Sequence, residues 1–193
     1  GRIVAAAVES FGRLDVLVNN AGIVRDRTIV KMTEEDFDAV LDVHLKGSFN
    51  CGRHAIPVMR EQGYGRIVNI TSSAVKSPID ILGLSNGARS GLTGFVAGTS
   101  RSSQLAGRNV TINNLLPGAF DTDRIRTTMK GAAEKTGKSI EEVADARKKT
   151  IPAQRFGTAE EFGMTCAFLC SAHASYITGQ NILTDGGAYP GTY

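Results

Sequence analysis

The chain has 193 residues, of which 41% are hydrophobic and 21% charged, and its formal net charge is +3. This length suits one globular domain with a sizeable core and is short for an enzyme of two domains. The basic residues are scattered, no apolar run approaches the roughly eighteen residues of a membrane span, and the first residues do not resemble a signal peptide, so we expect neither nucleic acid nor a membrane as a partner.

The first half of the chain alternates between helical and extended patterns. The first ten residues have the apolar spacing of the tail end of a helix, which Phe11-Gly12-Arg13 breaks, and residues 14–18 form an apolar run typical of a strand buried on both faces. Thr33, followed by three acidic residues, begins a long predicted helix that reaches about Met59. Residues 66–70 then predict a second strand.

The second half continues this alternation. Residues 84–105 have helical spacing despite their glycines, and residues 109–115 predict a third strand. The polar residues 121–150 predict a helical excursion that covers a substrate, and a plain pair of surface helices is an equal alternative. Thr158 begins another capped helix, and residues 178–187 predict a last strand with a glycine turn. Helices alternating with apolar strands indicate one α/β domain with a mostly parallel sheet.

Four motifs occur in the order known from one protein family. They are LDVLVNNAG at 14–22, GRIVNITSS at 65–73, Pro117-Gly118 with Thr122, and YITGQ followed by DGG at 176–187. On these motifs the chain resembles the short-chain dehydrogenases/reductases (SDRs), and in part a divergent subgroup similar to 3-oxoacyl-[acyl-carrier-protein] reductases. The resemblance spans residues 1–193 and implies a Rossmann-type α/β fold, with a doubly wound parallel sheet in a three-layer α/β/α arrangement.

The resemblance also implies a function. SDRs transfer a hydride between NAD or NADP and a small-molecule carbonyl or alcohol, and the subgroup points to a 3-oxoacyl-like substrate. The residues implied along the cofactor are Asn19, Ala21, Gly22, Pro117, Gly118 and Thr122. A homodimer or homotetramer is implied, formed through the predicted helices 33–59 and 84–105.

The N-terminal part of the family pattern has no counterpart here. The family begins with a strand and a glycine-rich turn whose backbone N–H groups hold a pyrophosphate, followed by further strands, and no such turn occurs in this sequence. We therefore expect an N-terminally truncated Rossmann domain whose first strands are missing. Such a chain would expose the apolar sheet edge at residues 14–18.

The catalytic positions also depart from the family, which uses a Ser and a Tyr-x-x-x-Lys pair. Aligning residues 88–92 with the family places Ser85 at the Tyr position and Arg89 at the Lys position. Counting forward from Ser73 gives Asn86 and Ser90 instead, so neither register supplies Tyr or Lys. A serine hydroxyl is a far weaker acid than a phenol, whose pKa is about 10, and arginine cannot exchange a proton. Whether the chain is an enzyme therefore stays open, and an inactive SDR-fold binding or scaffold protein is the alternative.

Other side chains are candidates for the same site. Ser72 and Ser73 follow strand 66–70 at its carboxyl end, where open α/β sheets bind ligands, so either could contact a substrate carbonyl or simply form a turn. His44 lies where the family often has an active-site Asn and could transfer a proton near neutral pH, although a histidine packed on a helix face is favoured. Lys76 could reach the same pocket but is more typical of a solvated lysine.

Two cysteines and a histidine have a spacing that could hold a metal ion. Cys166, Cys170 and His173 lie at i, i+4 and i+7, which could place three ligands on one helix face. The apolar stripe that the cysteines form with Phe162 and Leu169 favours packing against the sheet, so no metal is predicted. Three cysteines are too few for a disulfide framework, which predicts a reducing, cytoplasmic location.

Overall fold

The computed structural model describes residues 1–192, so Tyr193, the last residue of the predicted domain, lies outside the described residues. Within them a sheet has four parallel strands in the order β1-β2-β3-β4. The strands are β1 (Val16–Asn19), β2 (Gly65–Ile70), β3 (Val110–Pro117) and β4 (Asn181–Thr184). Each prediction of a strand is confirmed, although the last strand is shorter than the predicted run.

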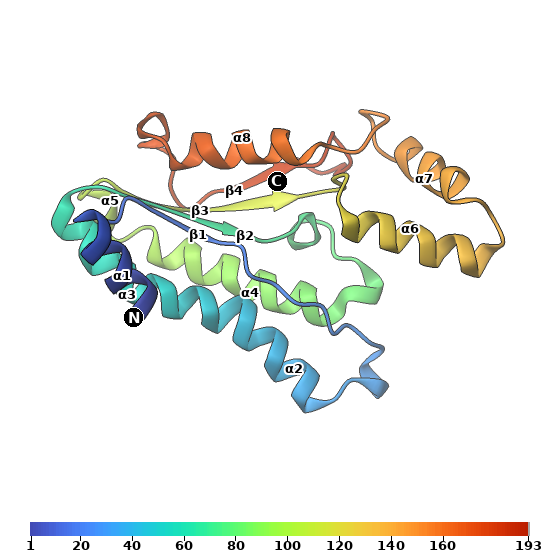
Figure 1. Cartoon of the computed structure of the whole chain (residues 1–193), viewed down its shortest axis with the longest axis horizontal. Coiled ribbons are helices and arrows are strands. Elements are labelled where there is room, and N and C mark those ends of the chain that lie inside the picture. The colour runs from blue at the N-terminus through green and yellow to red at the C-terminus, as the bar shows by residue number, and fades with distance from the viewer. Residues whose placement is uncertain (193) are drawn as a thin grey trace.

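Helices lie on both faces of the sheet, with α3 and α4 on one face and α8 on the other (Figure 1). The helices are α1 (Arg2–Phe11), α2 (Glu34–Leu41), α3 (Gly47–Gln62), α4 (Gly83–Thr99), α5 (Ser103–Ala106), α6 (Asp123–Thr136), α7 (Ile140–Lys149) and α8 (Ala159–Cys170), with single turns η1 (Ile29–Lys31), η2 (Asp42–Lys46), η3 (Ser73–Val75), η4 (Asp80–Leu82) and η5 (Ala172–Ala174). The three-layer, Rossmann-type arrangement is therefore confirmed.

The core consists of two layers that β2 joins. Ile67 packs with residues of α3 and α4, and the next residue, Val68, packs with Leu169 of α8. Successive side chains of a strand point to opposite faces, so a strand covered on both faces needs apolar residues without alternation. This requirement explains the continuous apolar runs in the sequence.

Asparagine side chains connect all four strands in one row across the sheet. The Asn19 amide donates to Asn69 Oδ1 at 2.8 Å, Asn69 donates to Asn114 at 3.2 Å, and Asn114 donates to Asn181 at 2.8 Å. These four residues are paired in the strand register. The ladder satisfies buried amides, and it opposes register slippage because a shift by one residue would leave them unpaired.

The long predicted helix contains a π-turn. Residues 33–59 form α2, then the turn η2, then α3, which continues to Gln62. The Thr33 hydroxyl accepts the Asp36 N–H as predicted for the helix start.

The prediction of one helix over residues 84–105 is wrong. The helix α4 ends at Thr99, and α5 begins at Ser103. Hydrogen bonds from Arg101 N–H to the Gly98 carbonyl and from Ser102 N–H to the Thr99 carbonyl tighten the last turn, and Ser102 leaves the helical conformation. Hydroxyl residues favour such helix ends because they offer local alternatives to the helical hydrogen bonds.

Residues 121–150 form the helices α6 and α7, which extend beyond the carboxyl ends of the strands (Figure 1). Thr122 caps α6, and Ser139 and Glu142 form the capping box of α7. A helical excursion is therefore present. That it covers a substrate remains a prediction.

The strand β1 is an edge strand within the described part of the chain. Its Val16 and Val18 are 38% and 42% exposed, because α3 covers only the opposite face of this strand. No helix in residues 1–192 is both long and apolar enough to cross a membrane.

Candidate active site

The predicted catalytic side chains lie near the carboxyl ends of β1 and β2. His44 comes from the π-turn, Ser72 follows β2, and Ser85 and Arg89 lie one turn apart on α4. The segments that follow these strands and the start of α6 lie at the same end of the molecule (Figure 1). Open parallel sheets bind ligands at this end of their strands.

His44 is buried and bonded to the segment that follows β1. Its Nε2 lies 2.9 Å from the Ile23 carbonyl oxygen and 3.3 Å from the Ile23 nitrogen. One nitrogen cannot donate and accept at once in a neutral ring, and the shorter contact favours a donor at Nε2. Burial lowers the pKa of His44, and nearby Arg89 and Arg124 lower it further, although the Ile23 carbonyl acts in the opposite direction. The ring is therefore neutral near pH 7, in keeping with a packed histidine.

The close approach of His44 explains a glycine. A Cβ on Gly22 would lie 2.7 Å from His44 Cε1, so any larger residue would displace the ring. π-turns are rare and occur frequently at functional sites. Gly22 and His44 thus form a tight contact between the end of β1 and the π-turn.

Ser85 is hydrogen-bonded to Asp26, a residue that the sequence analysis missed. Asp26 Oδ1 accepts the Ser85 N–H at 2.9 Å, and Oδ2 accepts the Ser85 hydroxyl. Ser85 is only 4% exposed. Leu82, at the N-cap position of α4, has no side chain that can cap the helix. Asp26 therefore caps α4 from a distant segment.

The orientation of Asp26 follows from the residues on either side of it. Arg25 and Arg27 both reach the buried carboxylate of Asp36 on α2, at 3.7 and 2.9 Å. Alternate side chains of an extended segment point in opposite directions, so Asp26 faces α4. An Arg-Asp-Arg alternation before an acidic helix start is the sequence signal that could have found this residue.

Arg89 joins α4 to the end of β2. Its Nη1 donates to the Thr71 carbonyl at 2.7 Å, next to Ser72. Burial and the charge of Arg124 lower the pKa of Arg89, and Asp26 opposes this shift. The alternative register is less favourable, because Asn86 donates to the Ile79 carbonyl at 2.7 Å and Ser90 is exposed.

The two serines after β2 form a turn. Ser72 Oγ accepts the Ala74 N–H at 3.1 Å and so caps η3, while Ser73 begins that turn. The neighbouring Thr71 Oγ1 is buried and has no hydrogen-bond partner among the described residues. The Nζ of Lys76 lies over the Tyr189 ring, 5.7 Å from its centroid.

The predicted cofactor residues follow β1 and β3. Asn19 belongs to the asparagine ladder, and Ala21 is exposed beside it. Pro117 ends β3, and Thr122 caps α6. A Cβ on Gly118 would lie 2.6 Å from Asp185 Cβ, so the chain approaches β4 closely at this point.

The polar ends of β1 and β3, with Asn19 and Thr122, lie where an open parallel sheet would bind a dinucleotide. At Gly22 and Gly118 the place of a Cβ is taken by His44 and Asp185, so these glycines allow chain segments to pack closely there. No described strand is followed by a glycine-rich turn that opens a helix and could cradle a pyrophosphate. The described residues could therefore contact a dinucleotide only outside its pyrophosphate.

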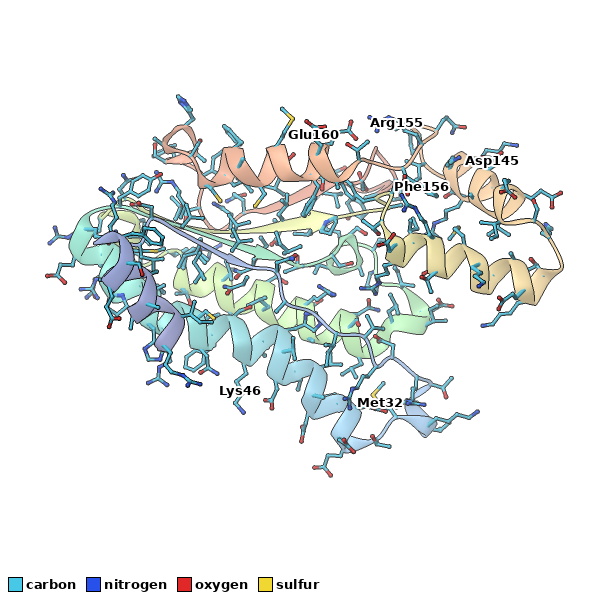
Figure 2. All side chains as sticks on the ribbon, in the orientation of Figure 1. Met32, Lys46, Asp145, Arg155, Phe156 and Glu160 are labelled. Carbon is cyan, nitrogen blue, oxygen red and sulfur yellow. The ribbon has the colours of Figure 1, made fainter. Side chains whose placement is uncertain are left out.

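A cavity of about 170 Å³ lies at the ends of β3 and β4, beside the start of α8. It is lined partly by Phe120 and Asp185 and by the ion pair of Arg155 with Glu161, whose atoms approach to 2.6 Å. Arg155 and Phe156 lie in the segment between α7 and α8 (Figure 2). No predicted catalytic residue lines this cavity.

The cysteines of α8 pack against the core. Cys166 and Cys170 lie against the cluster that contains Val68 and Leu169. Burial, together with Cys166, raises the pKa of the Cys170 thiol to about 11. A protonated, apolar-packed thiol agrees with the packing interpretation of this pair.

Comparisons with known proteins agree with this fold. The family described as "Enoyl-(Acyl carrier protein) reductase" matches residues 1–189. The chain is 41% identical over 187 residues to the 3-oxoacyl-[acyl-carrier-protein] reductase FabG of Thermotoga maritima, covering 96% of this chain and 70% of that protein. It is 38% identical over 190 residues to the short-chain reductase protein NovJ of Streptomyces niveus, covering 95% of this chain and 68% of that protein.

A solved structure is also similar. The crystal structure of YwfH, described as an NADPH-dependent reductase involved in bacilysin biosynthesis, superposes with a TM-score of 0.91 at 31% identity and covers 99% of this chain and 73% of that one. The chain belongs to the short-chain dehydrogenase/reductase family of oxidoreductases. Its relatives include 3-oxoacyl-[acyl-carrier-protein] reductases, as the sequence motifs indicated.

Proposed function

We propose that this protein is an NAD(P)-dependent oxidoreductase that transfers a hydride between the cofactor and a small-molecule carbonyl or alcohol, similar to a 3-oxoacyl group. The observation that supports this most directly is the convergence of Ser72, Ser85 and Arg89 around the carboxyl end of β2, linked by the Arg89–Thr71 hydrogen bond. This is the end of a parallel sheet where ligands bind.

Residues after β1 and β3 would hold the cofactor. They are Asn19, Ala21, Gly22, Pro117, Gly118 and Thr122. A bound nicotinamide supplies or accepts the hydride. The role of this chain is to orient the reacting carbon and to stabilise charge on the substrate oxygen.

Ser72 is suited to contact that oxygen. Its Oγ accepts the Ala74 N–H and donates to no described residue, so its proton is available to a carbonyl oxygen. Arg89 is half-buried and adds positive charge beside it. Together they can stabilise a developing alkoxide, although neither replaces the tyrosine as a strong proton donor.

A binding or scaffold protein is the second candidate function. Ser85 is buried, and its hydroxyl donates to Asp26 rather than to an open pocket. His44 is likewise engaged by the backbone of Ile23. Both side chains therefore have structural partners at positions where the family has catalytic groups.

Calorimetric titration of NADH and NADPH distinguishes these two functions, because it measures whether the protein binds the cofactor. The titration uses the 193-residue chain and a chain extended upstream in its gene. We expect the longer chain to bind one nucleotide in preference to the other and to oxidise it with a carbonyl substrate. If neither length binds either nucleotide, the oxidoreductase proposal is wrong and the scaffold function is supported.

A further inference from the structure

No carboxylate among the described residues forms an ion pair with the Arg89 guanidinium. Its guanidinium has five N–H donors, and its one hydrogen bond within residues 1–192 is the 2.7 Å bond to the Thr71 carbonyl. The group is half-buried, and a buried charge is costly unless it is paired. Donors of Arg89 therefore remain available to a ligand at the end of β2.

Arg124, in the first turn of α6, is also without an ion pair among the described residues. The carboxylates beside it, Asp121 and Asp123, are both held by Arg126, each at 3.1 Å. Arg124 is exposed, so its side chain can move towards a ligand. In the first turn of α6, Arg126 is therefore paired with carboxylates, whereas Arg124 is not.

The two arginines are anchored near the ends of neighbouring strands. The Arg89 side chain is bonded to Thr71, which directly follows β2, and α6 with Arg124 begins shortly after the neighbouring strand β3 (Figure 1). The charge of Arg124 also contributes to lowering the pKa of both Arg89 and His44. Asp26, the carboxylate that acts on the same groups, is already hydrogen-bonded to Ser85.

We propose that Arg89 and Arg124 bind an oxyanion of the substrate, so that the protein acts on carbonyl or alcohol compounds that carry a carboxylate or phosphate group. This inference rests on the proposed oxidoreductase function and names its substrate class. Guanidinium groups bind carboxylates and phosphates through paired, charge-assisted hydrogen bonds. The position at the carboxyl end of β2 places this anion beside Ser72, where the carbonyl would bind.

The first test measures anion binding without turnover. Malonate and inorganic phosphate are titrated into the protein, into Arg124→Gln and into Lys130→Gln, which removes the same charge from an exposed residue elsewhere on α6. The affinity of at least one probe should fall about tenfold or more in Arg124→Gln, as expected for loss of a charge-assisted hydrogen bond, and should be unchanged in Lys130→Gln. Equal affinities in all three proteins would overturn the anion site.

The second test compares a 3-oxo acid with its methyl ester as substrates. The KM of the acid should rise about tenfold or more in Arg124→Gln, while the KM of the ester and the kcat of both stay close to those of the unmodified protein. A variant that loses only NAD(P)H affinity would overturn the proposal, because the charge would then serve the cofactor.

The two tests separate the inference from the function on which it rests. Anion binding that depends on Arg124, without turnover of any carbonyl compound, contradicts the oxidoreductase function and leaves the anion site intact. Turnover of acid and ester with equal KM, and no change in Arg124→Gln, contradicts the anion site and leaves the oxidoreductase function intact.

Discussion

At the residue scale, the candidate catalytic side chains are held by oxygen atoms of the protein. Ser85 and Arg89, which the predicted alignment places at the family's tyrosine and lysine, are hydrogen-bonded to Asp26 and to the Thr71 carbonyl. The Ser85 hydroxyl thus donates to Asp26 rather than to a substrate, whereas carbonyl reduction needs a proton donor at the substrate oxygen.

Restoring the family pair tests this arrangement. Ser85→Tyr combined with Arg89→Lys should raise turnover, because a phenol beside an ammonium is a much better proton donor than a serine hydroxyl. If Ser85 together with Arg89 carries the turnover of the unmodified protein, Ser85→Ala should abolish that turnover with little loss of stability. Both are measured as the rate of nicotinamide oxidation at fixed cofactor occupancy. An unchanged rate in the double variant, with cofactor still bound, would contradict the alignment of Ser85 with the tyrosine.

Asp26 should contribute to stability as a helix cap. Asp26→Ala removes both hydrogen bonds to Ser85 and should lower the free energy of unfolding by about 1 kcal/mol, as for other N-cap losses. Asp26→Asn is the matched control, because its side-chain oxygen can still accept the Ser85 N–H. Urea unfolding should therefore place Asp26→Asn between Asp26→Ala and the unmodified protein, and equal losses in both variants would contradict capping.

At the element scale, capping decides where the helices begin. In the capping boxes at Ser139 and Thr158, the N-cap hydroxyl accepts the N3 N–H and the N3 glutamate accepts the N-cap N–H. The Thr158 box has an additional ion pair, because Glu161 also binds Arg155. This arrangement fixes α8 beside the cavity at the ends of β3 and β4.

The start of α8 should make stability depend on pH. The Arg155 hydrogen bond and the Thr158 N–H lower the pKa of Glu161 from 4.5 to about 2. Because the folded pKa is below the unfolded one, this stabilisation is fully present above about pH 4.5 and is lost as the pH falls through about 2.

Thermal unfolding midpoints measured at low ionic strength across this range should show the effect. Glu161→Gln should flatten that part of the profile. Glu160→Gln should not, because Glu160 has no ion pair among the described residues. The effect should be small and should shrink in high salt, since Glu161 is exposed. A profile unchanged by Glu161→Gln would show that the ion pair is not maintained in solution.

At the scale of the whole molecule, the outer face of α3 and α4 is uncovered. Phe49 and Phe95 contact each other edge to face with ring centroids 6.2 Å apart, yet they are 40% and 45% exposed. A Cβ on Gly94 would meet nothing within 4 Å, so the space beside α4 is open at this position. These are the helices through which the sequence predicts a homodimer or homotetramer.

A charge on that face should weaken self-association. Gly94→Glu should shift the protein towards monomer in light scattering coupled to size-exclusion chromatography, because it places a carboxylate among apolar groups that a second copy would cover. Gly131→Glu on α6 is the control, since its Cβ also meets open space but lies on another element. Dissociation by both variants, or by neither, would contradict this interface.

The sequence by itself determined the family, the parallel sheet and most helix starts. Short apolar runs without alternation, bounded by turn residues, are typical of strands covered on both faces, and hydroxyl-acid pairs mark helix N-termini through local hydrogen bonds. These signals arise from neighbours in the chain. The predicted helix over residues 84–105 failed because its apolar spacing does not show where serine and threonine hydroxyls end a helix.

Only the tertiary structure decided how the site side chains are paired. Arg66 is the one charged residue of β2, yet it is fully buried because the carbonyls of Ser171 and Asn109 accept its hydrogen bonds. Asp26 and Ser85 are 59 residues apart in sequence, and no local pattern predicts their contact. Residue type fixes which groups can donate or accept protons and hydrogen bonds, but a hydrogen bond also requires close approach, which here depends on how segments distant in the sequence pack together.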